Sequence, residues 1–303
     1  MLSSALSVAW ADPTARHAAG RHARALLDHA RAVIADGLGA RPDEVTLHAS
    51  GDQAARTALL ALGRGRRRRT AAPVASAVEH SVLLRHLAAG DREPTLVPVD
   101  ARASAGRDEV PGEHDVLVAD ATGWGGPRLG VLVVRTGTRV APHHPPSPHE
   151  GGYALDPVDV PTVLAAAEAW QHTAAQRADE EVQARRLVAR VRAAAASLPE
   201  VDVVGDPEDR LPHVCTFSVL YVDGETIVDE LARRGLAVAS GSACTADTLE
   251  PSHVLAAMGA LTQGNVRLTL PLAAVAPDRA TSVERLVTEL GDVVATCRAR
   301  LGA

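Results

Sequence analysis

A long alanine-rich helical region divides the chain into two parts, and this division constrains the fold more than any other feature. Residues 160–198 carry apolar side chains at roughly helical repeats, among them Val188 and Val191, and Pro199 ends the pattern. On both sides of this region, short apolar runs alternate with helical patterns. The sequence therefore predicts an α/β protein whose two lobes are joined by a helix.

The first part shows a βαβ rhythm, which predicts a parallel sheet. An amphipathic pattern over residues 15–38 predicts a helix with one buried stripe, and Gly39 follows its end. The predicted strands cover residues 44–48, 95–97, 116–119 and 131–134, with Pro98 ending the second of them. The predicted helices between the first two strands cover residues 52–62 and 81–88.

The second part predicts a smaller α/β domain with a mixed or antiparallel sheet. Its predicted strands are residues 214–222, 236–239 and 266–270, and its predicted helices are residues 225–234 and 283–294. Upstream of the long helix, the proline- and glycine-rich segment 141–152 marks a structural boundary. We therefore expect an N-terminal segment (1–10), a first α/β domain (11–159), a linking helical region (160–198) and a second domain (199–303).

Composition excludes several classes of protein. Hydrophobic residues make up 46% of the 303 residues, yet no apolar stretch approaches the roughly 20 residues that span a bilayer, and no basic leader precedes the first domain, so we expect a cytoplasmic protein without membrane contact. A net charge of −6 and 2% aromatic residues argue against nucleic-acid binding, so we interpret the basic run 66–69 as a solvated turn. The three cysteines lie too far apart to indicate a disulfide framework or a zinc site.

A histidine-rich stretch raises the question of a metal site. His143, His144, His149 and Glu150 carry side chains that suit a transition metal. Three prolines interrupt the stretch, however, and loop histidines are usually exposed to solvent. We predict no metal.

The most informative segment is a cysteine in a run of small residues. Residues 239–245 read ASGSACT, residues 249–255 read LEPSHVL, and residues 265–268 read NVRL. Small residues let a loop move without steric cost, and a thiolate in such a loop can reach a sulfur atom on a partner. A guanidinium forms a fork that matches a carboxylate, so Arg267 is a candidate anchor for an amino-acid or C-terminal carboxylate. We predict that Cys244 is the nucleophile and that Cys215 and Cys297 are structural.

This segment resembles the cysteine desulfurases of the class V aminotransferase fold. The resemblance implies a fold-type I pyridoxal-phosphate-dependent transferase architecture, with a reduced large domain and a small C-terminal domain. It also implies that His80 stacks on the pyridine ring, that Ser50 and Gly51 begin the turn that cradles the cofactor phosphate, and that Asp120 is a remnant of the pyridinium partner. Upstream segments that resemble the family more loosely are residues 12–21, 41–45 and 76–80.

The chain departs from the family at the cofactor lysine. In register with Gly126 and Pro127, Gly123 stands where the family has that lysine, and all 31 basic residues of the chain are arginine. Gln53 replaces the threonine that binds phosphate in the family, and Asp52 adds a like charge beside the phosphate. Because the family chemistry needs the lysine amine to form its aldimine, we expect no cofactor and only remnant binding positions.

Three functions remain open at this point, and whether the chain is an enzyme is undecided. In the first, a degenerate desulfurase homologue of sulfur metabolism accepts or relays persulfide sulfur on Cys244 without Schiff-base chemistry. In the second, a non-catalytic partner dimerises with a complete desulfurase or acts as its scaffold. The third, an active desulfurase with loosely bound pyridoxal phosphate, has the least support from the residues. The resemblance implies a homodimer or a heterodimer with a complete desulfurase, and a sulfur-carrier or acceptor protein as a further partner.

Overall fold

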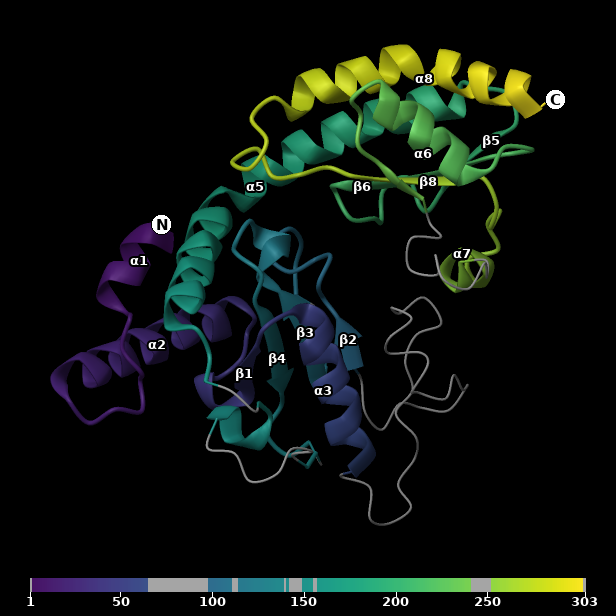
Figure 1. The fold of residues 1–303 in the computed structure, drawn as a ribbon. Coiled ribbons are helices and arrows are strands. Elements are labelled where there is room, and N and C mark those ends of the chain that lie inside the picture. The colour runs from purple at the N-terminus through teal and green to yellow at the C-terminus, as the bar shows by residue number, and fades with distance from the viewer. Residues whose placement is uncertain are drawn as a thin grey trace. The chain divides into compact units, whose positions relative to one another are not determined.

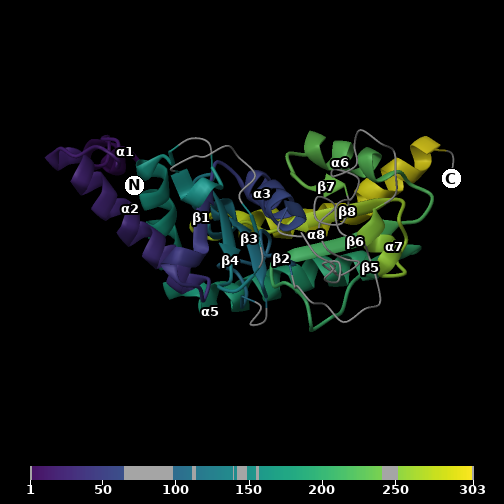
Figure 2. The same cartoon turned by 90° about the horizontal axis from the view of Figure 1, so that it is seen from below.

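The computed structural model describes residues 2–64, 98–110, 114–138, 140–141, 149–154, 157–240 and 252–301. The chain forms two compact units, residues 1–177 and 178–303, which are described separately. The long helix α5 (Val160–Ala196) contributes to both units (Figures 1 and 2). Among the described residues, no helix is both long and apolar enough to cross a membrane.

Unit 1 is built on a four-stranded sheet with the strand order β1-β4-β3-β2. The strands are β1 (Val45–His48), β2 (Pro98–Asp100), β3 (Val116–Asp120) and β4 (Gly130–Val134). β2 and β3 are parallel, whereas β4 is antiparallel to both of its neighbours, β1 and β3. Because the first four residues of both β3 and β4 are buried, these strands carry continuous apolar runs instead of an alternating pattern.

Two details of the predicted sheet are wrong. The sheet is mixed because β4 runs against its neighbours, although the sequence pattern had indicated a parallel sheet. Pro98 begins β2 instead of ending a strand at residues 95–97, which lie outside the described residues. A proline is accepted as the first residue of a strand because its missing N–H need not enter the ladder. The predicted strands at 44–48, 116–119 and 131–134 are confirmed to within one residue at either end.

Helices cover both faces of the first sheet. α3 (Gly51–Arg64) packs on one face through three buried alanines, Ala54, Ala55 and Ala58, against Val116 and Val118. α2 (Ala18–Gly37) and the first part of α5 pack on the other face. α2 begins at His17, whose Nδ1 accepts a hydrogen bond from the Gly20 N–H (3.1 Å). A short helix, α1 (Leu2–Val8), precedes α2 (Figure 1).

Two tryptophans fix the turn that follows β3. Trp124 ends the 3-10 helix η2 (Ala121–Trp124), is fully buried, and lies edge-on to Trp170 with ring centroids 4.9 Å apart. Its indole N–H donates to the carbonyl of Ala166 (3.0 Å). Gly37 must be a glycine because a Cβ there would lie 2.0 Å from the Trp170 indole nitrogen. This packing holds η2 in a single position at the edge of the sheet.

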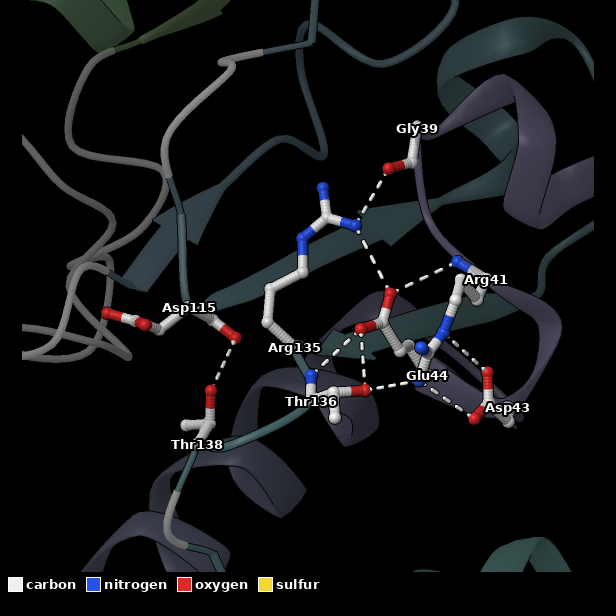
Figure 3. Close-up of polar contacts among 8 residues, drawn as sticks. All are labelled: Gly39, Arg41, Asp43, Glu44, Asp115, Arg135, Thr136 and Thr138. Carbon is white, nitrogen blue, oxygen red and sulfur yellow. Dashed lines mark hydrogen bonds and ion pairs between the residues drawn. The ribbon is translucent and has the colours of Figure 1, made fainter.

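A network of hydrogen bonds around Glu44 joins the start of β1 to the residues that follow β4 (Figure 3). Glu44, at the end of the 3-10 helix η1 (Pro42–Glu44), accepts hydrogen bonds from the backbone N–H groups of Arg41 (3.1 Å) and Thr136 (2.8 Å) and from the Thr136 hydroxyl (2.9 Å). It also pairs with Arg135 (3.2 Å). Burial alone would raise the pKa of Glu44, but these hydrogen bonds lower it to about 2. Glu44 therefore ties the start of β1 to the end of β4 as an ionised group.

Unit 2 contains a second four-stranded sheet, which is antiparallel throughout with the order β5-β6-β8-β7. Its strands are β5 (Val201–Val204), β6 (Val214–Val219), β7 (Ala239–Ser240) and β8 (Asn265–Thr269). Its helices, besides the second part of α5, are α6 (Gly224–Arg233), α7 (His253–Ala257) and α8 (Arg279–Leu301). The antiparallel alternative of the sequence prediction is confirmed, and the last helix is longer than predicted at both ends.

One face of the second sheet carries the core of unit 2. Cys215, Phe217 and Val219 of β6 and Val266 and Leu268 of β8 contact buried side chains of α5, α6 and α8. These three helices cover this face of the sheet (Figure 1). The other face carries Thr216, Arg267 and Thr269, of which the last two are exposed. The sheet therefore has one apolar face and one polar face.

Candidate functional site

The carboxyl ends of β1, β2 and β3 lie at one edge of the first sheet. These strands run in the same direction, because β4 is antiparallel to β1 and β3 while β2 is parallel to β3. Ser50 and Gly51 follow β1, Arg102 follows β2, and Asp120 ends β3. Open α/β sheets usually bind ligands at this edge. The sequence had predicted Ser50, Gly51 and Asp120 as site residues, and the fold brings all three together.

Asp120 is hydrogen-bonded by the segments on either side of it. Its Oδ2 accepts from the backbone N–H of Gly51 at 2.6 Å, at the first residue of α3. Its Oδ1 accepts from the backbone N–H (3.0 Å) and the hydroxyl (2.7 Å) of Thr122. The hydroxyl of Ser50 accepts from the N–H of Gln53 (3.2 Å) and so caps the same helix. Asp120 and Ser50 thus satisfy donors of the first turn of α3 and of η2.

Arg102 lies in the same cluster, and sequence reasoning had missed it. Its guanidinium pairs with both carboxylate oxygens of Asp100 (2.6–3.0 Å) and with the carboxylate of Asp52. The Arg102 and Asp100 side chains are 15% and 7% exposed, whereas Asp52 is 67% exposed. Burial would lower the pKa of Arg102, but hydrogen bonds and charge from Asp100 and Asp52 raise it. Asp52, which we had predicted to repel an anion, therefore serves as a partner of Arg102.

Arg102 also fills the space in front of the helix start. A Cβ on Gly51 would lie 2.6 Å from the Arg102 Cδ and 2.9 Å from the Asp120 Cβ, so only glycine fits there. A Cβ on Gly123, which the sequence analysis had placed in register with the family lysine, would lie 2.9 Å from the carbonyl oxygen of Arg102. The segment that carries Arg102 is therefore packed against both positions.

In unit 2, Arg267 stands in a different environment. It lies in β8, paired across the sheet with Thr216 of β6 and Ala239 of β7, and its side chain is exposed. Directly opposite residues of an antiparallel pair project from the same face, so the three side chains share the polar face of the sheet. The Arg267 guanidinium makes no hydrogen bond or ion pair with any residue in the described part of the chain. This cation remains available to a ligand or to a neighbouring thiolate.

Two predicted site residues, Cys244 and His80, lie outside the described residues. The other two cysteines have free thiols and are both buried. Burial raises the pKa of Cys215 to about 11. Burial and then the charge of Glu230 also raise the pKa of Cys297. At neutral pH both thiols are therefore protonated and poor nucleophiles.

The histidine-rich stretch provides a structural carboxylate. Glu150 forms a two-pronged ion pair with Arg31 (2.7 Å for each contact) and accepts from the backbone N–H of Leu47 (2.8 Å). It thereby joins α2 to β1. His143 and His144 lie outside the described residues, and within those residues no group of three histidine, cysteine, aspartate or glutamate side chains is arranged to hold a metal ion.

Comparisons with known sequences identify relatives of the chain. Residues 157–278 match the family model of aminotransferase class V. The chain is 36% identical over 165 residues to cysteine desulfurase IscS 1 of Archaeoglobus fulgidus, a match that covers 53% of this chain and 43% of that protein. It is 34% identical over 210 residues to cysteine desulfurase IscS of Methylococcus capsulatus, covering 66% of this chain and 50% of that protein. The matched region thus spans about half the length of the curated relatives.

Solved structures resemble the chain over more of its length. A NifS-like protein superposes with a TM-score of 0.81 at 17% identity, covering 95% of each chain. The apo structure of a cysteine desulfurase from Thermococcus onnurineus NA1 gives a TM-score of 0.76 at 17% identity, covering 97% of this chain and 91% of that one. The fold is therefore that of the NifS-like, fold-type I pyridoxal-phosphate-dependent transferases, as the resemblance had implied.

One sequence-based expectation is corrected by these relatives. We had expected no cofactor because no lysine is present. The cysteine desulfurases that match this chain form a pyridoxal-phosphate-dependent family, and nothing among the relatives indicates loss of the cofactor. The absence of one side-chain amine was too narrow a basis for that expectation, because a cofactor is also held by hydrogen bonds and charge.

The described residues of unit 1 provide a test of how this cofactor fits. Its phosphate would need the N–H groups at the start of α3, and its ring nitrogen would need a carboxylate. In this structure the N–H of Gly51 is bonded to Asp120, and Arg102 packs against Gly51. The cofactor would fit at this edge only if the Gly51–Asp120 hydrogen bond and the packing of Arg102 on Gly51 were broken. We therefore assign chemistry only to side chains of the chain itself.

Proposed function

We propose that this homologue of the cysteine desulfurases, which contains an aminotransferase class V region, takes up and passes on sulfur as a persulfide on Cys244. The similarity to cysteine desulfurases supports a cysteine desulfurase-like role in sulfur metabolism. The pairing of β7 with β8 carries the finer proposal. It sets Ala239, five residues before Cys244, directly opposite Arg267. The strand that leads to the cysteine thus starts beside an exposed cation without a described partner.

The proposed step is a thiol–persulfide exchange. The Cys244 thiolate attacks the outer sulfur of a donor persulfide, R–S–SH, and breaks its S–S bond. Cys244 becomes Cys–S–SH, and the donor leaves as the thiolate R–S⁻. The reverse exchange passes the sulfur to an acceptor thiol. No external oxidant or reductant is consumed, and Arg267 would favour the attacking thiolate by its charge.

A mass measurement tests this proposal. The protein is incubated with an active cysteine desulfurase and free cysteine. The masses of the cysteine-containing peptides are then measured by mass spectrometry without a reducing agent. We expect one added sulfur atom on Cys244. Cys215→Ala and Cys297→Ala variants should still take it up, because their buried thiols do not take part, whereas Cys244→Ser should not.

Two other outcomes would replace the proposal. If Cys244 gains no sulfur, the chain is better explained as a scaffold for a complete desulfurase. If Cys244 gains sulfur from free cysteine and pyridoxal phosphate without a second desulfurase, the chain is itself a desulfurase. A Cys244→Ser control separates protein-bound sulfur from sulfide in solution in both cases.

One observation suggests that the chain also forms a dimer, in addition to transferring sulfur. Leu6 and Trp10, four positions apart at the start of unit 1, are 53% and 72% exposed. Large apolar side chains that are exposed close together in the sequence are typical of a protein contact. We propose that this pair contributes to a dimer. Light scattering should show a dimer that Trp10→Gln weakens and Val275→Gln, a change at a 62% exposed site in unit 2, leaves intact. A monomer at micromolar concentration would contradict this proposal.

A further inference from the structure

We infer that Arg185, Arg192 and Arg210 form a phosphate-binding site on unit 2, a property independent of the proposed sulfur transfer. Arg185 and Arg192 lie on α5, and Arg210 lies in the loop between β5 and β6, residues 205–213. All three residues are half-buried. Within the described residues, Arg185 alone of the three has a carboxylate partner, Glu181 (2.8 Å), in a pair whose side chains are 36% and 37% exposed. Such a surface pair offsets little charge.

The loop is held along α5 by hydrogen bonds from the helix to carbonyl oxygens. Arg192 donates to the carbonyls of Val204 and Gly205 (2.9 Å each). Arg185 donates to the carbonyl of Glu208 (3.2 Å). The two arginines are about two helical turns apart, so they project from the same face of α5. Because a guanidinium carries five N–H donors, both arginines keep donors that the loop does not use.

Arg210 adds a third guanidinium to this face. It donates to the carbonyls of Pro207 (3.2 Å) and Leu211 (3.3 Å), both in its own loop. Burial first, and then the positive charges of Arg192 and Arg185, lower the pKa of Arg210. Its neighbouring charges are therefore of the same sign. In the part of the chain that the structure describes, no carboxylate forms an ion pair with Arg192 or Arg210.

The acidic residues of the loop do not neutralise the cluster. Asp206 accepts hydrogen bonds from the backbone N–H groups of Glu208 (2.7 Å) and Asp209 (2.8 Å). These bonds, more than the charge of Arg192, lower the pKa of Asp206. Glu208 and Asp209 are exposed and form no ion pair with any described residue. Two half-buried guanidiniums thus face each other without a paired anion.

A phosphate group matches this arrangement better than a carboxylate does. A carboxylate has two oxygens and one charge, so the fork of a single arginine satisfies it. A phosphate group carries close to two charges and at least three acceptor oxygens, so it can accept from several guanidiniums and offset their repulsion. The ligand is therefore free inorganic phosphate or the phosphate of a small monoester.

Thermal unfolding of the full chain tests the site. Parent and variants are compared in sodium phosphate and in sodium chloride at the same pH and ionic strength. We expect about 20 mM phosphate to raise the unfolding temperature of the parent by about 2–4 °C. Arg192→Gln and Arg210→Gln should abolish this shift. In dilute chloride, Arg210→Gln should unfold at the same temperature as the parent or higher, because the variant removes a like charge and only long hydrogen bonds within the loop.

A matched control and a second ligand sharpen the result. Arg186→Gln removes the same charge from the exposed residue next to Arg185 and should keep the full phosphate shift. A larger shift with glycerol phosphate than with inorganic phosphate would assign the site to a monoester, and an equal or smaller one to the free anion.

Three results would overturn the inference. The first is a parent protein that neither phosphate stabilises beyond chloride. The second is a shift that persists in Arg210→Gln, which would place the anion elsewhere; this variant decides the question if Arg192→Gln does not fold. The third is an equal loss of the shift in Arg186→Gln, which would indicate a diffuse effect of surface charge.

Discussion

The two sheets carry their charged groups in opposite ways. At the carboxyl edge of the first sheet, Arg102 is matched by Asp100 and Asp52, and Asp120 is matched by backbone and hydroxyl donors. On the polar face of the second sheet, Arg267 is exposed and has no partner among the described residues. A buried charge must be paired to be tolerated, whereas an exposed cation costs little when alone.

This contrast separates a stability role from a binding role. The charged side chains at this edge of unit 1 are paired with one another, so removing one of them should mainly lower the free energy of unfolding. The charge of Arg267 is not used by the fold, so removing it should mainly affect what approaches the polar face of unit 2. The predictions below test this division, beginning with the largest expected effect.

Arg102→Ala should cause the largest loss of stability. It leaves the carboxylate of Asp100, whose side chain is 7% exposed, without its main partner. Removing one member of a largely buried pair costs about 3–5 kcal/mol, and we expect a value near the lower end because Asp52 is exposed and can be hydrated. Denaturant unfolding measures the change.

A matched control is provided by an ion pair on the surface of the same unit. Arg24→Ala removes a pair with Asp28 in which the side chains are 59% and 52% exposed, so it should cost less than about 1 kcal/mol. Asp100→Asn in the Arg102→Ala background should recover part of the loss, because the buried charge that faced the Arg102 guanidinium is removed. Equal costs for Arg102→Ala and Arg24→Ala would break the contrast between the two sheets.

The positions of most strands in the first sheet could be predicted from apolar runs. The direction of those strands was predicted wrongly. Val116–Asp120 and Gly130–Val134 are evident in the sequence because both are continuous buried runs. The prediction that these two strands are parallel was wrong, although the sequence contained evidence that they are antiparallel. Only residues 121–129 separate the two strands, which is shorter than the dozen or more residues that a parallel crossover requires. Loop length should have outweighed the general βαβ rhythm.

The charge cluster of unit 1 could be predicted only in part. Ser50, Gly51 and Asp120 were found through the family resemblance, and they do come together. Arg102 was missed because Pro98 had been interpreted as the end of β2, so the residue after the strand was placed wrongly. Contacts of this kind depend on tertiary register, which local patterns do not contain.

Glu44 is a second paired charge of unit 1, and it should stabilise the protein in a pH-dependent way, by less than Arg102 does. Its pKa falls from 4.5 to about 2 on folding, so it stabilises the protein fully above about pH 5, and this contribution is lost as pH falls from 4.5 toward 2. Glu44→Gln should cost about 1–2 kcal/mol at pH 7. The difference in free energy of unfolding between parent and variant should shrink below pH 4.5. A difference that stays constant down to pH 2.5 would show that the charge of Glu44 does not contribute.

Arg267→Ala should have the smallest effect on stability and a clear effect on thiol chemistry. Because the guanidinium is exposed and lacks a described partner, the free energy of unfolding should change by no more than about 0.5 kcal/mol. The same change removes the cation beside the strand that leads to Cys244, so the pKa of this thiol should rise and its alkylation at neutral pH should slow. The slowing should vanish well above the thiol pKa, where the thiolate forms without help. Arg298→Ala, a change on α8 within the same unit, serves as the control and should leave the rate unchanged. A large loss of stability without any change in alkylation would place Arg267 with the structural charges of unit 1, and the proposed role of the polar face would then be wrong.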